Sequence, residues 1–195
     1  MNLYLEKMLG FHCAPTLMYK KMANLVVLKC KFFLPEELDA FNIHMNENNI
    51  FFKTLKVTKE NHTLLVYNKE ALSHRLNGKD TQEFLGHYNY TNFTLVHALE
   101  HLCKRYNENV FPHEIGIFLD YPLEDVKGFI DNKGKNFIFS GYWKVYKFSR
   151  EKNKLFSEYT KCRCFLCQLL ADGANLCECI GGKNENRNNL LVSNW

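Results

Sequence analysis

The stretch Asn24-Leu25-Val26-Val27-Leu28-Lys29-Cys30, followed by Pro35-Glu36-Glu37, decides the fold class. Its first part is short, apolar and rich in β-branched residues, which predicts a strand. The proline and the two glutamates then predict the first turn of a helix that runs to about Asn46. A strand followed directly by a helix is typical of a mixed α/β fold.

The same succession continues toward the middle of the chain. Residues 50–57 and 63–67 predict two further strands, and residues 69–76 predict a short helix. The first half therefore indicates a small sheet flanked by helices, a mixed α+β arrangement. We expect residues 1–180 to form a single layered domain and residues 181–195 to form a frayed tail.

The second half of the chain has a mostly helical pattern. Helices are predicted at residues 81–86, 92–106, 112–119, 123–131 and 150–170. The aromatic run 137–146 predicts a strand before the last helix. Two short helices that meet at a tight turn predict a helix-turn-helix-like hairpin near residues 113–131.

Composition gives the chain a substantial core and excludes several classes of protein. The 195 residues (23.0 kDa) are 46% hydrophobic, which excludes wholesale disorder, and a net charge of +4 does not indicate a dedicated nucleic-acid binder. No apolar run approaches the ~20 residues that span a bilayer, and no leader peptide is visible. We therefore expect a cytoplasmic protein, with no membrane association, whose eight cysteines are free thiols.

A helix-turn-helix hairpin is a common DNA-binding element, but the chemistry of this one does not suit DNA. Its second helix begins Leu123-Glu124-Asp125, and two carboxylates at that position repel phosphate. We do not expect DNA binding, and we interpret the hairpin as scaffolding or as a surface for a protein partner.

Cys13 is the strongest candidate for a reactive thiol. Pro15 is expected in the first turn of a short helix that runs to about Lys21, which places Cys13 just before a helix N-terminus. A helix N-terminus lowers the pKa of a thiol and favours the nucleophilic thiolate. The alternative is a buried cysteine that serves packing alone.

His113 and Glu114 are candidates for acid–base chemistry because both side chains exchange protons in enzymes. Adjacent residues point in different directions on a helix, so the alternative is an ordinary helix start in which Glu114 favours the helix dipole.

Two further groups have side chains that bind metals. Five cysteines lie within 18 residues, at positions 162, 164, 167, 177 and 179, and His97 and His101 are spaced four residues apart. The cysteine spacing matches no standard zinc or iron–sulfur site, and the histidine pair lacks an identifiable further ligand. We interpret the cysteines as small hydrophobic residues and the histidines as surface residues, and we predict no metal site.

Several motifs together resemble a known bacterial family. They are Cys13-Ala14-Pro15-Thr16-Leu17, residues 111–130, Asn132-Lys133-Gly134-Lys135-Asn136 and Gly141-Tyr142-Trp143-Lys144-Val145-Tyr146. Over about residues 10–175 the chain resembles the domain-of-unknown-function family 3793, found mainly in anaerobic bacteria. Asp120 stands where that family usually has glycine, which makes the turn less permissive. The resemblance implies a redox or iron-metabolism setting and names no reaction.

From these features we expect the Cys13 segment, the His113 segment and the aromatic strand to line one pocket for a small-molecule ligand. The alternative is a non-enzymatic interaction or regulatory module that uses the hairpin. The sequence identifies no cofactor and does not decide whether the protein is an enzyme. The expected site residues are Cys13, His113 and Glu114 for catalysis, and Tyr142, Trp143 and Lys144 for ligand binding.

Overall fold

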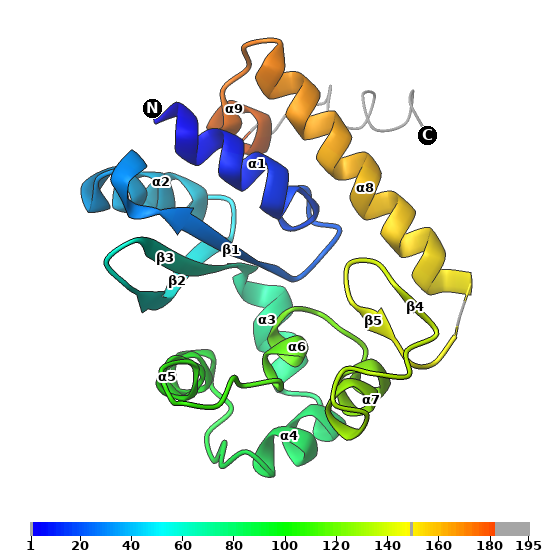
Figure 1. The fold of residues 1–195 in the computed structure, drawn as a ribbon. Coiled ribbons are helices and arrows are strands. Elements are labelled where there is room, and N and C mark those ends of the chain that lie inside the picture. Colours follow the sequence, from blue (N-terminus) through cyan, green and yellow to red (C-terminus); the bar gives the residue numbers. More distant parts are fainter. Residues whose placement is uncertain (1, 149, 182–195) are drawn as a thin grey trace.

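The computed structural model describes residues 2–148 and 150–181, which form helices around a small sheet (Figure 1). The elements follow in the order α1 (Leu3–Leu17), β1 (Ala23–Lys29), η1 (Cys30–Phe32), α2 (Pro35–Asn46), β2 (Ile50–Val57), β3 (Asn61–Asn68), α3 (Lys69–Leu76), α4 (Lys79–Gly86), α5 (Leu95–Tyr106), α6 (Ile115–Phe118), α7 (Leu123–Asp131), β4 (Phe139–Ser140), β5 (Lys144–Val145), α8 (Arg150–Ala171) and α9 (Leu176–Gly181). The mixed α+β fold class, with a small sheet flanked by helices, is confirmed.

The main sheet has three antiparallel strands in the order β1-β3-β2. β3 lies in the centre, where Leu65 pairs with Leu25 on one side and with Lys53 on the other. A central strand is covered on both faces, and β3 is correspondingly buried from Thr63 to Tyr67. The continuous apolar run of this segment is the sequence feature that places it at the centre.

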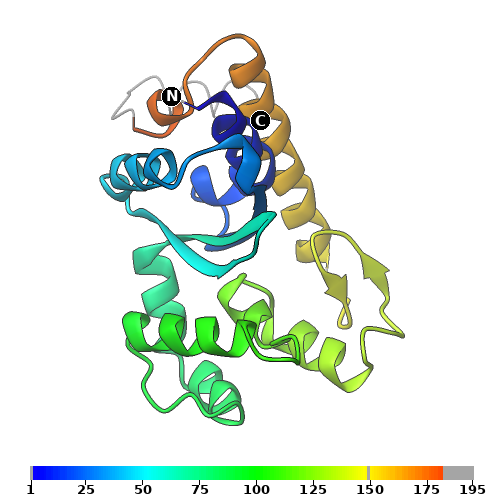
Figure 2. The same cartoon turned by 60° about the vertical axis from the view of Figure 1, so that its left-hand side comes forward.

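The sheet separates two hydrophobic cores because alternate side chains of a strand point to opposite faces. Leu64 and Val66 face the core formed with α1, α2, α8 and α9. Leu65 and Tyr67 face the core formed with α3, α4, α5, α6 and α7. Figure 2 shows the sheet between these two groups of helices.

Helix α1 differs from the prediction. It begins at Leu3, where the Asn2 side chain accepts hydrogen bonds from the Tyr4 and Leu5 amides, and Pro15 lies in its last turn. Pro15 has no backbone N–H, so the usual helical hydrogen bond to the carbonyl of Phe11 is absent. The expected helix start near Pro15 is therefore wrong.

The last two helices of the described chain, α8 and α9, pack against α1. The long helix α8 packs along α1, and a Cβ on Gly10 would lie 2.4 Å from Leu170 Cδ1, so a larger residue at this position would have to displace the end of the Leu170 side chain. The buried Glu6 accepts a hydrogen bond from the amide of Leu176, 3.1 Å away, and so caps α9.

The hairpin expected near residues 113–131 is present as α6, a turn and α7. Asp120 adopts a φ of +66° in the turn, in the left-handed region that asparagine, aspartate and glycine tolerate best. The apolar side of α6 is buried in the second core, together with Val126 of α7. The hairpin therefore packs its apolar side against the helices and the sheet around it.

The aromatic run 137–146 is not one strand, which corrects the prediction. It folds into the short antiparallel hairpin β4–β5, in which Phe139 pairs with Val145. The chain reverses at Gly141, whose amide donates to the Trp143 carbonyl at 3.0 Å. A Cβ on Gly141 would lie 2.3 Å from Phe156 of α8, so helix and hairpin meet where a side chain is absent.

Two expectations concern the ends and location of the chain. Within residues 2–148 and 150–181, no helix combines the length and apolar character needed to cross a membrane. The frayed tail expected at 181–195 lies, from residue 182 on, outside the described residues.

Candidate functional site

A cavity of about 420 Å³ lies where the α6–α7 hairpin meets the β4–β5 hairpin. Figure 1 shows these two hairpins side by side, next to the lower end of α8. The walls are mainly apolar and aromatic, as in most small-molecule sites. They are formed by Leu25, Phe111, His113, Ile115, Gly116, Leu119, Tyr121, Asp125, Val126, Phe129, Ser140, Gly141, Tyr142, Trp143 and Lys144.

Four of the six predicted site residues line this cavity: His113, Tyr142, Trp143 and Lys144. The ring of Trp143 stacks on that of Tyr121, with centroids 5.0 Å apart, and its edge meets Phe156 at 4.5 Å. Trp143 is buried, so these contacts on two sides hold its ring in one orientation. The cavity therefore has a preformed aromatic wall.

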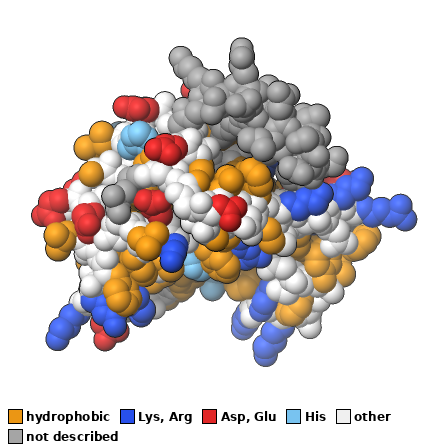
Figure 3. All heavy atoms as spheres, turned by 90° about the horizontal axis from the view of Figure 1, so that it is seen from above, with side chains coloured by type: hydrophobic (Ala, Val, Ile, Leu, Met, Phe, Trp, Pro, Cys, Tyr) orange, Lys and Arg blue, Asp and Glu red, His pale blue; other side chains and the backbone are white. Residues whose placement is uncertain are grey.

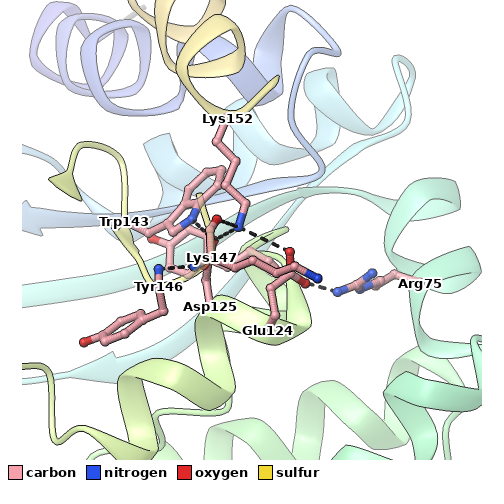
Figure 4. A network of polar contacts seen from close by, with 8 residues as sticks. Arg75, Glu124, Asp125, Trp143, Tyr146, Lys147 and Lys152 are labelled. Carbon is pink, nitrogen blue, oxygen red and sulfur yellow. Dashed lines mark hydrogen bonds and ion pairs between the residues drawn. The ribbon is translucent and has the colours of Figure 1, made fainter. Parts of the chain in front are cut away.

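Asp125 holds the β4–β5 hairpin against α7 (Figure 4). Its carboxylate accepts hydrogen bonds from Trp143 Nε1 and the Tyr146 amide, each at 2.8 Å, and from the Lys147 amide at 3.2 Å. The Lys152 ammonium of α8 lies 2.7 Å from the same carboxylate. One buried side chain thus joins α7, the hairpin and α8.

These contacts keep Asp125 ionised. Burial alone would raise its pKa, but the hydrogen bonds from Lys152, Tyr146, Trp143 and Lys147 outweigh burial and hold the pKa of Asp125 below its ordinary value. Lys152 offsets part of the negative charge of Asp125 and is shared with Glu124, 3.2 Å away, so Asp125 gives the cavity a fixed wall whose charge is partly compensated.

Lys144 supplies a cation at the rim. Its Nζ donates to the Gly134 carbonyl at 2.8 Å and lies 4.9 Å from the ring centre of Phe137 and 5.7 Å from that of Phe129. A carbonyl and two aromatic faces orient an ammonium without cancelling its charge. Lys144 is half-buried and can still meet an anionic group of a ligand.

His113 and Glu114 point to different sides, so the structure does not bring them together as an acid–base pair. The exposed His113 lies between the rings of Phe111 and Phe129, at 5.5 and 5.1 Å. Glu114 is fully buried and accepts a hydrogen bond from Arg105 Nε of α5. Glu114 does not line the cavity and instead anchors the loop that carries His113.

Cys13 also lies away from the cavity. It sits inside α1, fully buried in the core on the other face of the sheet. Burial raises the pKa of the Cys13 thiol strongly, and the nearby Lys21 offsets this only in part. The expected helix N-terminus that would lower its pKa is absent, because α1 starts ten residues earlier at Leu3.

The other sulfur and imidazole groups are dispersed among the described residues. Cys162 and Cys177 are buried in the same core as Cys13, whereas Cys164 is exposed on α8. His97 Nδ1 lies 2.8 Å from Thr94 Oγ1, and His101 Nε2 lies 3.0 Å from the Tyr88 carbonyl. In the part of the chain that the structure describes, no group of three or more His, Cys, Asp or Glu side chains could hold a metal ion.

Asp125 and Tyr121 are the main site residues that the sequence did not reveal. In the sequence Asp125 was considered only as one of two carboxylates that repel phosphate, yet it is buried beside Val126 and lines the cavity. Its spacing of four residues from the apolar Phe129 was the signal that both share one helix face.

Comparisons with known proteins agree with the resemblance seen in the sequence. The family described as "Protein of unknown function (DUF3793)" matches residues 9–180. Neither the curated proteins nor the solved structures that were compared contain a match. The match covers the second half of α1, the sheet, both hairpins and the later helices, and the chain therefore belongs to the DUF3793 family.

Proposed function

We propose that this protein binds a small, flat, anionic ligand in the cavity between the α6–α7 and β4–β5 hairpins. The observation that carries the proposal is the cavity of about 420 Å³, a size suited to a small molecule, lined by aromatic side chains. The rings of Tyr121, Phe129 and Trp143 offer apolar surface to a planar group.

The charge of the cavity favours an anion. Lys144 lines it and bears a positive charge that carbonyl and aromatic contacts leave in place. Asp125, the carboxylate in the wall, is paired with Lys152. A ligand that stacks on the aromatic wall could therefore place a carboxylate, sulfonate or phosphate near Lys144.

The geometry supports binding rather than the catalytic arrangement expected from the sequence. Of the three residues expected to be catalytic, His113 lines the cavity, whereas Cys13 and Glu114 do not. A catalytic thiol and its base must lie within hydrogen-bond reach or one water of each other. The proposal therefore assigns no reaction.

The interaction-module alternative depended on an exposed apolar face of the α6–α7 hairpin. The side chains of Ile115, Ile117 and Phe118 are instead buried. The described residues on the face of the molecule in Figure 3 have acidic, basic and apolar side chains intermingled, and they form no continuous basic surface there that would follow a nucleic-acid backbone. Neither observation favours a macromolecular partner over a small ligand.

Native mass spectrometry of protein purified anaerobically from its own host tests the proposal. The variants are Lys144→Met, which removes the rim cation, and Lys135→Met, which removes an exposed cation outside the cavity. We expect one small molecule per chain in the wild type and in Lys135→Met, and a smaller bound fraction in Lys144→Met. Equal occupancy in all three proteins would contradict the role of Lys144. An empty wild type that also fails to take up added aromatic anions would overturn the proposal.

A further inference from the structure

A second cavity lies behind the turn that forms part of the first. It has a volume of about 410 Å³ and lies between the segment after α1 and helix α3. Asp120 lines this second cavity, whereas its neighbours Leu119 and Tyr121 line the aromatic one. The turn between α6 and α7 therefore forms a wall that the two cavities share.

The second cavity is rich in positive charge. Lys20 and Lys21 line it from the segment after α1, and His74 and Arg75 line it from α3. Asp120 is the one acidic residue among the described residues that line it. Two lysines, an arginine and a histidine therefore line the same cavity as a single described carboxylate.

Lys21 is a buried cation without a carboxylate partner. It is 4% exposed, and its Nζ donates to the carbonyls of Ala23 and Leu119. Carbonyl oxygens bind the ammonium but do not cancel its charge, and among the described residues no carboxylate oxygen lies within ion-pair distance of it. Burial lowers the pKa of Lys21 to about 8, although Asp120 and Cys13 act in the opposite direction. An anion in the cavity would stabilise this charge.

Arg75 is held in position by one hydrogen bond and has another N–H group that no described residue accepts from. Its Nη2 donates to the Tyr121 carbonyl at 3.2 Å, which fixes the guanidinium beside the shared turn. Its Nε is buried and donates to none of the described residues. A guanidinium with an unused N–H group, in a cavity that two lysines also line, matches the several acceptor oxygens of a phosphate.

We propose that this second cavity binds a phosphate group, either as inorganic phosphate or as part of a small phosphate ester. Lys20 and Arg75 donate to the phosphate oxygens from two sides, and Lys21 adds its charge from the wall. Asp120 opposes binding, because its carboxylate repels the dianion. The proposal uses residues that do not line the aromatic cavity and stands independently of the function proposed for that cavity.

Isothermal titration calorimetry with inorganic phosphate and with phenyl phosphate, at constant ionic strength, tests the proposal. Wild type is compared with Lys20→Gln and Arg75→Gln, and with Lys104→Gln, which removes an exposed charge of α5 outside the cavity. We expect saturable binding of one anion, about tenfold weaker in each cavity variant, and unchanged in Lys104→Gln. Tighter binding of phenyl phosphate identifies an ester as the ligand, and equal binding of both identifies phosphate itself.

Asp120→Asn should change phosphate binding in the opposite direction to the Lys20 and Arg75 variants. Asparagine tolerates a φ of +66°, and its side-chain oxygen can still accept the hydrogen bond that Asp120 receives from the Met22 amide at 3.1 Å. Removing the negative charge should tighten phosphate binding several-fold while the melting temperature is preserved. Absence of saturable binding of either anion, an equal loss in Lys104→Gln, or weaker binding in Asp120→Asn would overturn the proposal.

Discussion

Asp125 connects the ionisation of one residue to the shape of the aromatic cavity. It is 2% exposed and receives hydrogen bonds from the Trp143 indole and two backbone amides, as well as the Lys152 ammonium. Removing one partner of a buried ion pair leaves the other uncompensated. The carboxylate of Asp125 is therefore a structural requirement for the wall that carries Trp143.

Asp125→Asn should destabilise the protein by about 3 kcal/mol because Lys152 loses its buried counterion. Urea unfolding at pH 7 measures the change in the free energy of unfolding. Glu124→Gln is the matched control, since Glu124 also pairs with Lys152, at 3.2 Å, but is about half-exposed. The control should lose less than about 1 kcal/mol. Equal losses in both variants would show that the buried ion pair contributes no more to the free energy of unfolding than the half-exposed one, which would contradict this prediction.

The same carboxylate predicts how stability depends on pH. The pKa of Asp125 is lowered in the folded state, so its contribution is fully present above its unfolded pKa of about 3.9 and is lost as the pH falls through the lower folded value. Unfolding free energies measured from pH 6 to pH 2 should fall less steeply below about pH 4 in Asp125→Asn than in the wild type. Parallel curves for the two proteins would contradict this assignment.

Cys13 should be unreactive in the folded protein, because burial raises the pKa of its thiol and excludes reagents from it. We expect iodoacetamide at pH 8 to label the exposed Cys164 and to label Cys13 only after unfolding. Peptide mass spectrometry of native and urea-unfolded samples measures both. Rapid labelling of Cys13 in the native protein would contradict this prediction and would support the reactive thiol expected from the sequence.

Residue identity predicted part of the lining of one cavity, whereas the roles expected for these residues stay predictions. The aromatic and cationic character of Tyr142, Trp143 and Lys144 pointed to ligand binding, and all three line one cavity. The pairing of His113 with Glu114 could not be settled from sequence, because the partner that draws Glu114 away, Arg105, lies on another helix. Long-range partners of this kind leave no local signal.

At the scale of elements, the α6–α7 hairpin depends on a glycine. A Cβ on Gly116 would lie 2.7 Å from Val126 Cγ2 and 3.1 Å from Tyr121 Cδ2, closer than packed side chains allow. The missing side chain therefore lets α6 and α7 approach and leaves room in the aromatic cavity that Gly116 lines.

Gly116→Ala should cost about 2 kcal/mol through overpacking and should weaken binding in the aromatic cavity. The double variant Gly116→Ala/Val126→Ala should recover part of the binding, because it removes the Val126 methyl group with which the added Cβ would clash. Gly86→Ala is the control, since nothing lies within 4 Å of its added Cβ, and its stability should stay the same or rise. Thermal unfolding with a binding titration measures all three, and a neutral Gly116→Ala would contradict the packing described here.

Elements with a regular apolar pattern were predicted from sequence, and those without one were not. Strand β2 and helices α2, α3 and α7 have the predicted bounds. The three helices carry apolar residues at helical spacing, and β2 is an apolar run whose residues pack on both faces of the sheet. Helix α1 was missed because β1, α8 and α9 cover it from several sides, which removes the polar face that marks an amphipathic helix. The run 137–146 was misread because its turn at Gly141 is set by packing on α8.

At the scale of the molecule, the sheet separates two hydrophobic cores. The core of α1, α2, α8 and α9 joins the two ends of the described chain and contains Cys13, Cys162 and Cys177. Both cavities are lined in part by the turn between α6 and α7, which belongs to the other side of the sheet. The single-domain organisation expected for residues 1–180 stays a prediction.

The fold class was accessible from sequence, but the meeting of the two hairpins was not. The sheet and its helices follow from local patterns. The aromatic cavity requires residues 111–129 to meet residues 140–144, and this depends on the Asp125 contacts and on the close approach at Gly141. Neither feature has a signature within a short window of sequence.

The central claim is that a small aromatic anion occupies the cavity beside Trp143, and Trp143 itself can report it. The chain has two tryptophans, so Trp195→Phe leaves Trp143 alone. We predict that 8-anilino-1-naphthalenesulfonate quenches Trp143 emission saturably with one molecule per chain, about tenfold more weakly in Lys144→Met and equally in Lys135→Met. Trp143 emission that stays constant while the probe binds, or quenching unaffected by Lys144→Met, would contradict the account.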